Sequence, residues 1–337
     1  MSTAKMTSKK PTIYGKHEFI SIIVPTFNSE RTVGRCMESL VKQDYPKNRY
    51  EIIVVDKDSK DSTAKICKGF GVRFIVANTS PAGARNLGAK VAKGKIVMFT
   101  DSDCIVPRNV LRKIMDDFRK HDIAGVGGSY KTFNKEFPTA RFVGYEIGWR
   151  HSKQPRHTDF LGTYCCAYNR GLFIKFGGFD TSFKVASGED PEFSFKLSEA
   201  KHKLLFDNSI FVWHTHPSSL GKYLRQQFFR AYWRVNLYNK HPDKITGDIY
   251  TGLEIPYAPL LMCIFAITGL LAIAYPAAAY VSAVSLILYF AIYLSFFRFV
   301  SQSEIGLIPF SLAVIFLRTI VWIFGFAYGL VAYVRKI

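Results

Sequence analysis

Charged side chains are almost missing from the last quarter of the sequence. Residues 255–337 carry a net charge of +3, whereas the whole chain of 337 residues carries +19. The charged residues of this segment are Arg298, Glu304, Arg318, Arg335 and Lys336. Because soluble domains contain about 25% charged residues, the segment cannot form an ordinary solvated surface. It predicts helices in a lipid bilayer.

Three apolar runs in this segment are long enough to cross a bilayer, which takes ~20 residues. They are Ile255–Tyr275, Ala277–Phe297 and Ile305–Val334. Arg318 interrupts the third run, which is either one tilted helix or a short re-entrant piece followed by a helix. We expect about three crossings, with Arg318 satisfied between helices or at the interface, so that a reporter after Ile337 would lie outside. Buried core helices are the alternative, and a protein of this size has little room for them.

An apolar leader is also absent. Met1–Lys16 is polar and basic, without the apolar core that a secretory signal needs. Residues 1–254 carry +16 of the net charge, which favours the cytoplasmic side by the positive-inside tendency. We therefore expect an integral protein of a prokaryotic plasma membrane, with a catalytic domain on the cytoplasmic side.

Metal-binding or redox CxxC pairs and recognised nucleic-acid-binding modules are missing as well. The six cysteines are scattered, which favours reduced thiols over a disulfide framework. The lysines and arginines are scattered too, so we expect no nucleic-acid partner. The basic charge instead suits an anionic membrane surface or phosphorylated substrates.

Buried strands alternate with helices through the first hundred residues. The apolar runs Phe19–Pro25, Tyr50–Asp56, Val72–Val76 and Ile96–Thr100 predict strands, and Ser29–Gln43, Ser62–Phe70 and Ala82–Lys93 predict helices. This alternation is typical of an α/β protein with an open parallel sheet covered on both faces. Ligands bind such sheets at the carboxyl ends of the strands, which here carry Pro25-Thr26, Asp56 and Asp101.

The second half is less regular. We expect helices over Pro107–His121 and Pro138–Trp149, strands over Gly125–Tyr130 and Ser209–Val212, and an amphipathic helix over Ser218–Asn239. That last helix suits a membrane interface, the alternative being an ordinary surface helix. The expected organisation is a flexible N-terminus (1–16), a catalytic domain (17–217), an interface segment (218–254) and a transmembrane domain (255–337).

Carboxylates follow the fourth strand as Asp101-Ser102-Asp103. Hard oxygen ligands suit Mg²⁺ or Mn²⁺ beside a diphosphate, although acidic turns are common without any metal. Asp56 at the second strand end could accept hydrogen bonds from a nucleobase or ribose. Its alternative is a solvated turn that caps the next helix. Arg85, near a helix start, could reach a diphosphate.

Further polar residues lie downstream. Asp190, beside Glu189, could act as a general base for an incoming hydroxyl, or either acid could merely cap a helix. His214 could complete a coordination sphere, or be an exposed loop histidine. Gln227 and Arg230, three residues apart, share a helix face and could close over an acceptor or a diphosphate. The alternative is that Arg230 contacts a phospholipid head group.

Six motifs, in this order, resemble the family 2 glycosyltransferases with a GT-A fold, over roughly residues 19–235. They are VPTFNSE (Val24–Glu30), VVDKDSKD (Val54–Asp61), PAGARNLG (Pro81–Gly88), TDSD (Thr100–Asp103), GGFD (Gly177–Asp180) and GEDPEFSFKL (Gly188–Leu197). Gln227–Ala231 is similar to the QxxRW motif of cellulose-synthase-like members. Lys57 and Asp58 depart from the usual VVDDGSTD, and Ala231 replaces the tryptophan of QxxRW.

The resemblance implies a Rossmann-like mixed sheet and an inverting sugar transferase. The nucleotide-sugar set is Pro25, Thr26, Asn28, Glu30, Asp56, Asp58, Arg85 and Asp101. The Mn²⁺ or Mg²⁺ set is Asp101, Asp103 and His214, and the catalytic set is Asp190, Glu189, Gln227 and Arg230.

We expect a sugar to move from a nucleotide-sugar to a lipid-linked acceptor, either dolichyl or polyprenyl phosphate or a lipid-linked glycan. Family analogy alone favours GDP-mannose. The alternatives are a UDP-sugar polysaccharide synthase, which Ala231 and the few spanning runs disfavour, and a silent nucleotide-binding membrane protein. A nucleotidyltransferase would need a glycine- and lysine-rich loop after the first strand, and Pro25–Arg31 is not one.

Overall fold

The computed structural model describes residues 14–185, 187–247, 249–252 and 254–335. Its strands are β1 (Ile20–Thr26), β2 (Tyr50–Asp56), β3 (Arg73–Val76), β4 (Ile96–Thr100), β5 (Cys104–Ile105), β6 (Gly125–Thr132), β7 (His157–Thr158), β8 (Cys165–Asn169) and β9 (Leu204–His214). The helices of the sheet domain are α1 (Val33–Val41), α2 (Thr63–Lys68), α3 (Pro81–Val91), α4 (Val110–Lys120), α5 (Pro138–Lys153), α6 (Arg170–Lys175) and α7 (Glu189–Glu199). The helices that follow are α8 (Leu220–Lys240), α9 (Glu254–Leu271), α10 (Ala278–Ala291), α11 (Leu294–Glu304) and α12 (Ile308–Val334). Single 3₁₀ turns occur at Lys47–Arg49, Pro242–Lys244 and Ile305–Leu307.

The strands form one mixed sheet in the order β3-β2-β1-β4-β8-β6-β9-β5, with β7 paired to β9. β1, β2, β3 and β4 run parallel, whereas β8 lies antiparallel to both β4 and β6. The side chains of β4 are all buried because helices cover both faces of the sheet. The expected α/β fold with a mixed sheet is confirmed, and the purely parallel arrangement holds only for its first four strands.

Element boundaries follow the sequence closely where the apolar pattern is strongest. β2 and β4 begin and end at the predicted residues. The helix expected from Ser29 begins only at Val33, because Asn28 adopts a φ of 47° and the chain turns over Ser29–Thr32 first. β9 begins at Leu204, five residues before the predicted Ser209. Its first residues pair with β6, which is distant in the sequence, so no local pattern marks this start.

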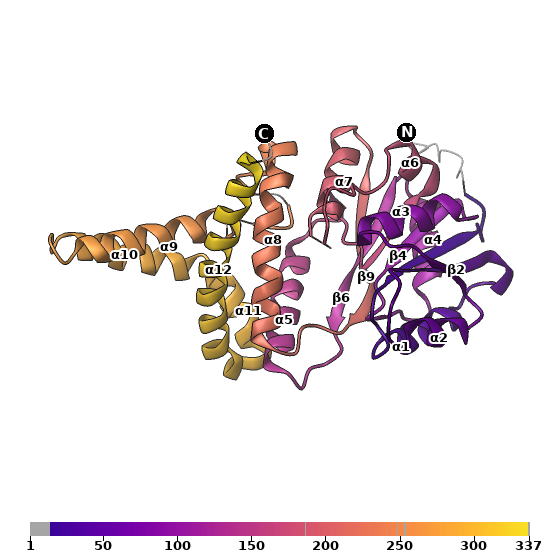
Figure 1. Cartoon of the computed structure of the whole chain (residues 1–337), viewed down its shortest axis with the longest axis horizontal. Coiled ribbons are helices and arrows are strands. Elements are labelled where there is room, and N and C mark those ends of the chain that lie inside the picture. Colours follow the sequence, from indigo (N-terminus) through magenta and orange to yellow (C-terminus); the bar gives the residue numbers. More distant parts are fainter. Residues whose placement is uncertain (1–13, 186, 248, 253, 336–337) are drawn as a thin grey trace, which may run out of the picture.

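The C-terminal helices stand beside the sheet domain, and the α9–α10 hairpin projects away from it (Figure 1). α12 runs parallel to α8 and packs along it. A Cβ on Gly325 would lie 2.5 Å from the Phe228 carbonyl oxygen, and one on Gly329 would lie 2.6 Å from that of Tyr232. Two glycines four residues apart therefore let the backbones of α8 and α12 approach closely.

The second apolar run, Ala277–Phe297, does not form one helix. α10 has 14 residues and ends at Ala291, and α11 begins at Leu294. Within the described residues, two stretches are long and apolar enough to cross a membrane, Glu254–Leu271 and Leu294–Val334. The number of crossings therefore stays a prediction.

Arg318, which interrupts the apolar α12, is only 1% exposed. Its guanidinium pairs with Glu146 of α5 and donates hydrogen bonds to the hydroxyls of Tyr223 and Tyr293. Glu146 also accepts from Arg150, whose guanidinium lies 3.2 Å from Glu254 at the start of α9. The expectation that Arg318 is satisfied between helices is met, and the counter-charge comes from the sheet domain.

Candidate active site

The carboxyl ends of β1 and β4 open into one cavity of about 1870 Å³. Its walls include the strand ends with Pro25, Thr26 and Asp101, the N-terminal turn of α7, and the face of α8. α9 and α12 close the far end with apolar side chains. A single cavity therefore joins the acidic edge of the sheet to the apolar helices.

Asp103 and His214 form the candidate metal centre. The Nε2 atom of His214 lies 3.4 Å from Oδ1 of Asp103, and the backbones pair where β5 meets β9. The ring of Tyr130 stacks on His214 at 5.0 Å, and Nδ1 of His214 is buried without a hydrogen-bond partner among the described residues. A carboxylate and an imidazole nitrogen fit Mn²⁺ or Mg²⁺ with open positions for substrate oxygens.

The thiol of Cys104 also faces this group of ligand atoms. Burial and the neighbouring Asp103 and Asp101 raise the pKa of Cys104 well above its usual range. The Cys104 thiol is therefore neutral on its own. Asp103 and His214 supply the carboxylate oxygen and the imidazole nitrogen that suit Mn²⁺ or Mg²⁺.

Arg85 ties the two acidic motifs together. It is 2% exposed, and its guanidinium lies 2.7 Å from Asp101 Oδ1 and 3.0 Å from Glu189 Oε1. Glu189 is also buried, and its second oxygen accepts the Ser187 amide at 2.7 Å. Arg85 and Glu189 line the cavity, but their charges are neutralised by each other. Their ion pair therefore holds the protein structure together and leaves neither charge free for a ligand.

Asp190 is the carboxylate at the mouth of the cavity. It sits in the first turn of α7, after Gly188 in the left-handed region with a φ of 111°. A Cβ at Gly188 would meet the Phe183 ring at 2.7 Å, so only glycine fits this turn. Burial, and then the charge of Glu189, raise the pKa of Asp190 to about 7. Such a carboxyl is poised to exchange a proton near neutral pH.

The remaining predicted nucleotide residues lie at the rim or behind it. Asp56 is buried and accepts hydrogen bonds from Thr26 Oγ1 at 2.7 Å and Ser59 Oγ at 2.6 Å. The exposed Asp58 pairs with Lys60. Thus Asp56 braces the loop after β2 in this structure, and a contact with a base would use the oxygens it already engages.

Asn28 and Glu30 organise the same loop from the β1 side. The amide of Asn28 donates to Ser59 Oγ at 2.8 Å, and its side-chain oxygen accepts the Lys60 amide. Glu30 accepts the amide of Ser62 at 3.0 Å. Neither residue lines the cavity, so the structure gives both a loop-holding contact and leaves their ligand role a prediction.

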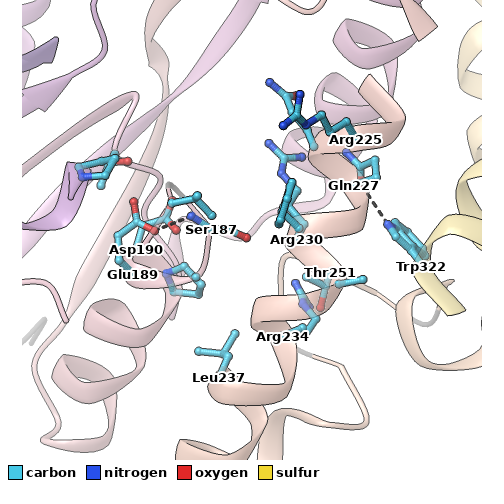
Figure 2. Close-up of a pocket in the computed structure, with 18 of the residues that line it drawn as sticks. Ser187, Glu189, Asp190, Arg225, Gln227, Arg230, Arg234, Leu237, Thr251 and Trp322 are labelled. Carbon is cyan, nitrogen blue, oxygen red and sulfur yellow. Dashed lines mark hydrogen bonds between the residues drawn. The ribbon is translucent and has the colours of Figure 1, made fainter. Parts of the chain in front are cut away.

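Gln227 and Arg230 of α8 differ in environment. Gln227 is buried, and its side-chain oxygen accepts a hydrogen bond from Trp322 Nε1 of α12 at 3.0 Å. Arg230 is exposed to the cavity. Figure 2 shows Arg225, Arg230 and Arg234 projecting from α8 on the opposite side of the pocket from Asp190. Gln227 therefore fastens α8 to α12, whereas Arg230 faces the site.

Sequence reasoning missed the polar wall behind this site. Glu146 and Arg150 of α5, Tyr130 and His216 all line the cavity. Glu146 is held between Arg318 and Arg150; these charges outweigh its burial and lower its pKa to about 2. The available signal was Arg318 itself, since a cation in an apolar run requires a buried anion elsewhere.

The sequence profile of "Glycosyl transferase family 2" matches residues 21–176. Glycosyltransferase AglE of Haloferax volcanii is 30% identical to this chain over 223 residues, which cover 62% of this chain and 71% of that protein. The chain belongs to glycosyltransferase family 2. The recognition from motifs is thereby confirmed, and this protein is a glycosyltransferase.

Two further proteins are similar to this glycosyltransferase. A Methanococcus voltae protein named dolichyl N-acetyl-alpha-D-glucosaminyl phosphate 3-beta-D-2,3-diacetamido-2,3-dideoxy-beta-D-glucuronosyltransferase is 26% identical over 230 residues, or 62% of this chain and 70% of that one. The mannosyltransferase PcManGT of Pyrobaculum calidifontis, solved with GDP-Man and Mn²⁺, has a TM-score of 0.58 at 19% identity. It covers 93% of this chain and 90% of its own, so the shared fold includes the C-terminal helices.

Proposed function

We propose that this glycosyltransferase moves a sugar from a nucleoside-diphosphate sugar to a hydroxyl of a lipid-linked acceptor, with inversion at the anomeric carbon. The observation that supports it best is the single cavity, which runs from Asp103 and Asp190 to the apolar residues of α9 and α12. A water-soluble acceptor would not need the apolar end. A membrane protein without transfer chemistry would not need the carboxylate at the mouth.

The donor would lie at the strand ends, beside Pro25, Thr26 and Asp101. Asp103 and His214, with Asp101 nearby, would hold Mn²⁺ or Mg²⁺, which when bound offsets negative charge on the leaving diphosphate. Arg85 holds Asp101 and Glu189 in place through its ion pairs. Asp56 would contact the nucleobase by exchanging its hydrogen bonds to Thr26 and Ser59.

Asp190 would take the proton of the acceptor hydroxyl. The hydroxyl oxygen forms the new bond to the anomeric carbon, the bond from that carbon to the diphosphate breaks, and the nucleoside diphosphate leaves. A polyprenyl phosphate is already ionised and needs no such base. The raised pKa of Asp190 therefore favours a hydroxyl acceptor, and the name of the M. voltae relative describes a sugar carried on dolichyl phosphate.

For the donor we propose GDP-mannose first and UDP-sugars second. The order follows the family resemblance; PcManGT, which was solved with GDP-Man, shares the fold. For location we propose a prokaryotic plasma membrane with the sheet domain in the cytoplasm. The basic sheet domain and the two apolar stretches support that placement.

A donor and acceptor panel tests the proposal. Purified full-length protein in detergent, with Mn²⁺, would receive GDP-mannose or a UDP-sugar, with either polyprenyl phosphate or a polyprenyl-diphosphate-linked N-acetylglucosamine. We expect one donor to react, with metal dependence that Asp103→Ala removes, and transfer to the sugar hydroxyl that Asp190→Asn removes. Transfer to polyprenyl phosphate that survives Asp190→Asn would instead make the phosphate the acceptor. Nucleotide binding without turnover of any donor would support the alternative of a catalytically silent nucleotide-binding membrane protein.

A further inference from the structure

Cationic side chains follow one stripe of α8 along the cavity. Lys222, Gln226, Arg230 and Arg234 are each four residues apart and so form a row on the helix surface. All four line the cavity, and Arg225 lines it beside them. Figure 2 shows Arg230 and Arg234 on the wall that faces the active-site carboxylates. The row lies between the strand ends and the apolar helices.

These cations differ from every other arginine that lines the cavity. Arg85 and Arg150 are each ion-paired with two carboxylates at 3.2 Å or less. Among the residues that the structure describes, no carboxylate lies within 4 Å of the side-chain nitrogens of Arg230 or Arg234; Arg234 donates only to the Tyr238 hydroxyl at 3.3 Å. Positive charge thus faces the cavity without a carboxylate partner from the described residues.

The charge of Arg230 reaches the reaction space. Arg230 lines the same cavity as Tyr130, His216 and Tyr250. Tyr130 lies on β6, whereas His216 lies in the loop after β9 and Tyr250 in the loop before α9. An anion bound at Arg230 would therefore lie within the same cavity as Asp190.

An apolar wall continues from this row. Trp322, Ile323, Phe326 and Leu330 of α12 line the cavity beside α8. Phe326 and Leu330 are 37% and 45% exposed, so the wall is open to an apolar ligand. A ligand that satisfies both features must join an anionic group to a hydrocarbon chain.

We propose that Arg230 and Arg234 bind the phosphate that links lipid and saccharide in the acceptor, and that the first part of the lipid chain lies against α12. The inference rests on the proposed function and names the acceptor class: a saccharide joined to a polyprenyl chain through a phosphate or diphosphate. The sugar then extends from Arg230 toward Asp190. The donor diphosphate would lie at the opposite wall, beside Asp103 and His214.

Binding of short-chain probes tests this site without relying on turnover. Farnesyl phosphate, farnesyl diphosphate, farnesol and inorganic phosphate would be titrated into the full-length protein in detergent, with GDP and UDP binding measured in parallel. The variants are Arg230→Gln, Arg234→Gln and the double substitution. Arg298→Gln on α11 is the matched control, because Arg298 is exposed, lies outside the cavity and has no ion pair among the described residues.

We expect wild type to bind the farnesyl phosphates at least tenfold more tightly than farnesol or inorganic phosphate. Each single substitution should weaken that binding about tenfold, because a charge-assisted hydrogen bond is lost, and the control should not. Preference for the diphosphate over the monophosphate would identify the linkage. Nucleotide binding should stay unchanged in all variants, and matched melting temperatures would show that the variants fold.

Three outcomes would overturn the assignment. Equal farnesyl phosphate binding in wild type and the double variant would remove the site. Weakened GDP or UDP binding would make the arginines part of the donor site. Displacement of farnesyl phosphate by phosphatidylglycerol vesicles at similar concentration would indicate ordinary head-group contact. Each result is independent of whether donor turnover is seen, so failure of this site differs from failure of the proposed reaction.

Discussion

The two walls of the cavity treat charge in opposite ways. On the side formed by the strand ends and the first turn of α7, which we call the strand wall, the buried Arg85 holds Asp101 and the buried Glu189 in ion pairs. On the side formed by α8, which we call the helix wall, Arg230 and Arg234 have no carboxylate partner among the described residues. The strand wall is therefore arranged before any ligand arrives, whereas the helix wall depends on a ligand for its counter-charge. Such a difference suits a donor site that is arranged in advance and an acceptor site that is completed by the lipid acceptor itself.

The strongest test of the strand wall is Asp190→Asn. Removing the proton acceptor should lower kcat about 10²- to 10⁴-fold, with little change in donor KM. The fold should not suffer, because the raised pKa of Asp190 means that its charged form destabilises the native state. We expect the melting temperature of the variant to equal or exceed that of wild type above pH 7. A large drop in melting temperature would mean that Asp190 holds the structure instead.

The helix wall has buried charge of its own behind the cavity surface. Removing Arg318 with Arg318→Met leaves Glu146 buried beside Arg150 alone, and should cost about 3–5 kcal/mol of stability. The double variant Arg318→Met with Glu146→Gln should recover part of that loss, because no charge is left unmatched. Thermal unfolding in detergent would show it. Additive losses would mean that the two residues do not act as a pair.

The α8–α12 contact positions the helix wall. Gly329→Leu should cost about 1–3 kcal/mol, because a side chain there meets the Tyr232 carbonyl oxygen. We expect the acceptor KM to rise while nucleotide binding is unchanged, since the strand wall does not depend on this contact. Gly221→Leu is the control on α8, where an added Cβ meets nothing within 4 Å. Loss of nucleotide binding in Gly329→Leu would show that the walls are not separable.

The smallest expected effect is a shift in the pH profile. Because burial and Glu189 raise the pKa of Asp190 to about 7, kcat/KM should fall as pH drops through about 7 and Asp190 takes a proton. Glu189→Gln removes the second cause and should move this acid limb to lower pH. A profile that stays flat from pH 5 to 8 in wild type would exclude Asp190 as the titrating base.

Local patterns were sufficient for the strand wall. β2 and β4 were predicted residue by residue because both are continuous apolar runs, and a strand that is buried on both faces needs little else. The acids that follow them meet at one edge because parallel strands end together. Asp101, Asp103, Asp190 and His214 could therefore be gathered from sequence order and family motifs.

The contacts of the helix wall could not be predicted in this way. Glu146 and Arg318 are 172 residues apart, and Gln227 and Trp322 are 95 apart, with no periodicity that joins them. The break between α10 and α11 lies inside one apolar run, where hydropathy is uniform and helix ends carry no signal.

The sequence by itself determined the α/β sheet, the family, the acidic edge and the apolar C-terminal segment, because each depends on neighbouring residues or on short motifs. Only the tertiary structure decided that Arg318 is neutralised by Glu146, that glycines seat α12 on α8, and that Arg230 and Arg234 face the cavity with no carboxylate partner in the described part of the chain. Those features depend on which helix faces pack together. Packing between distant segments is a property of the whole chain, and a local pattern does not contain it.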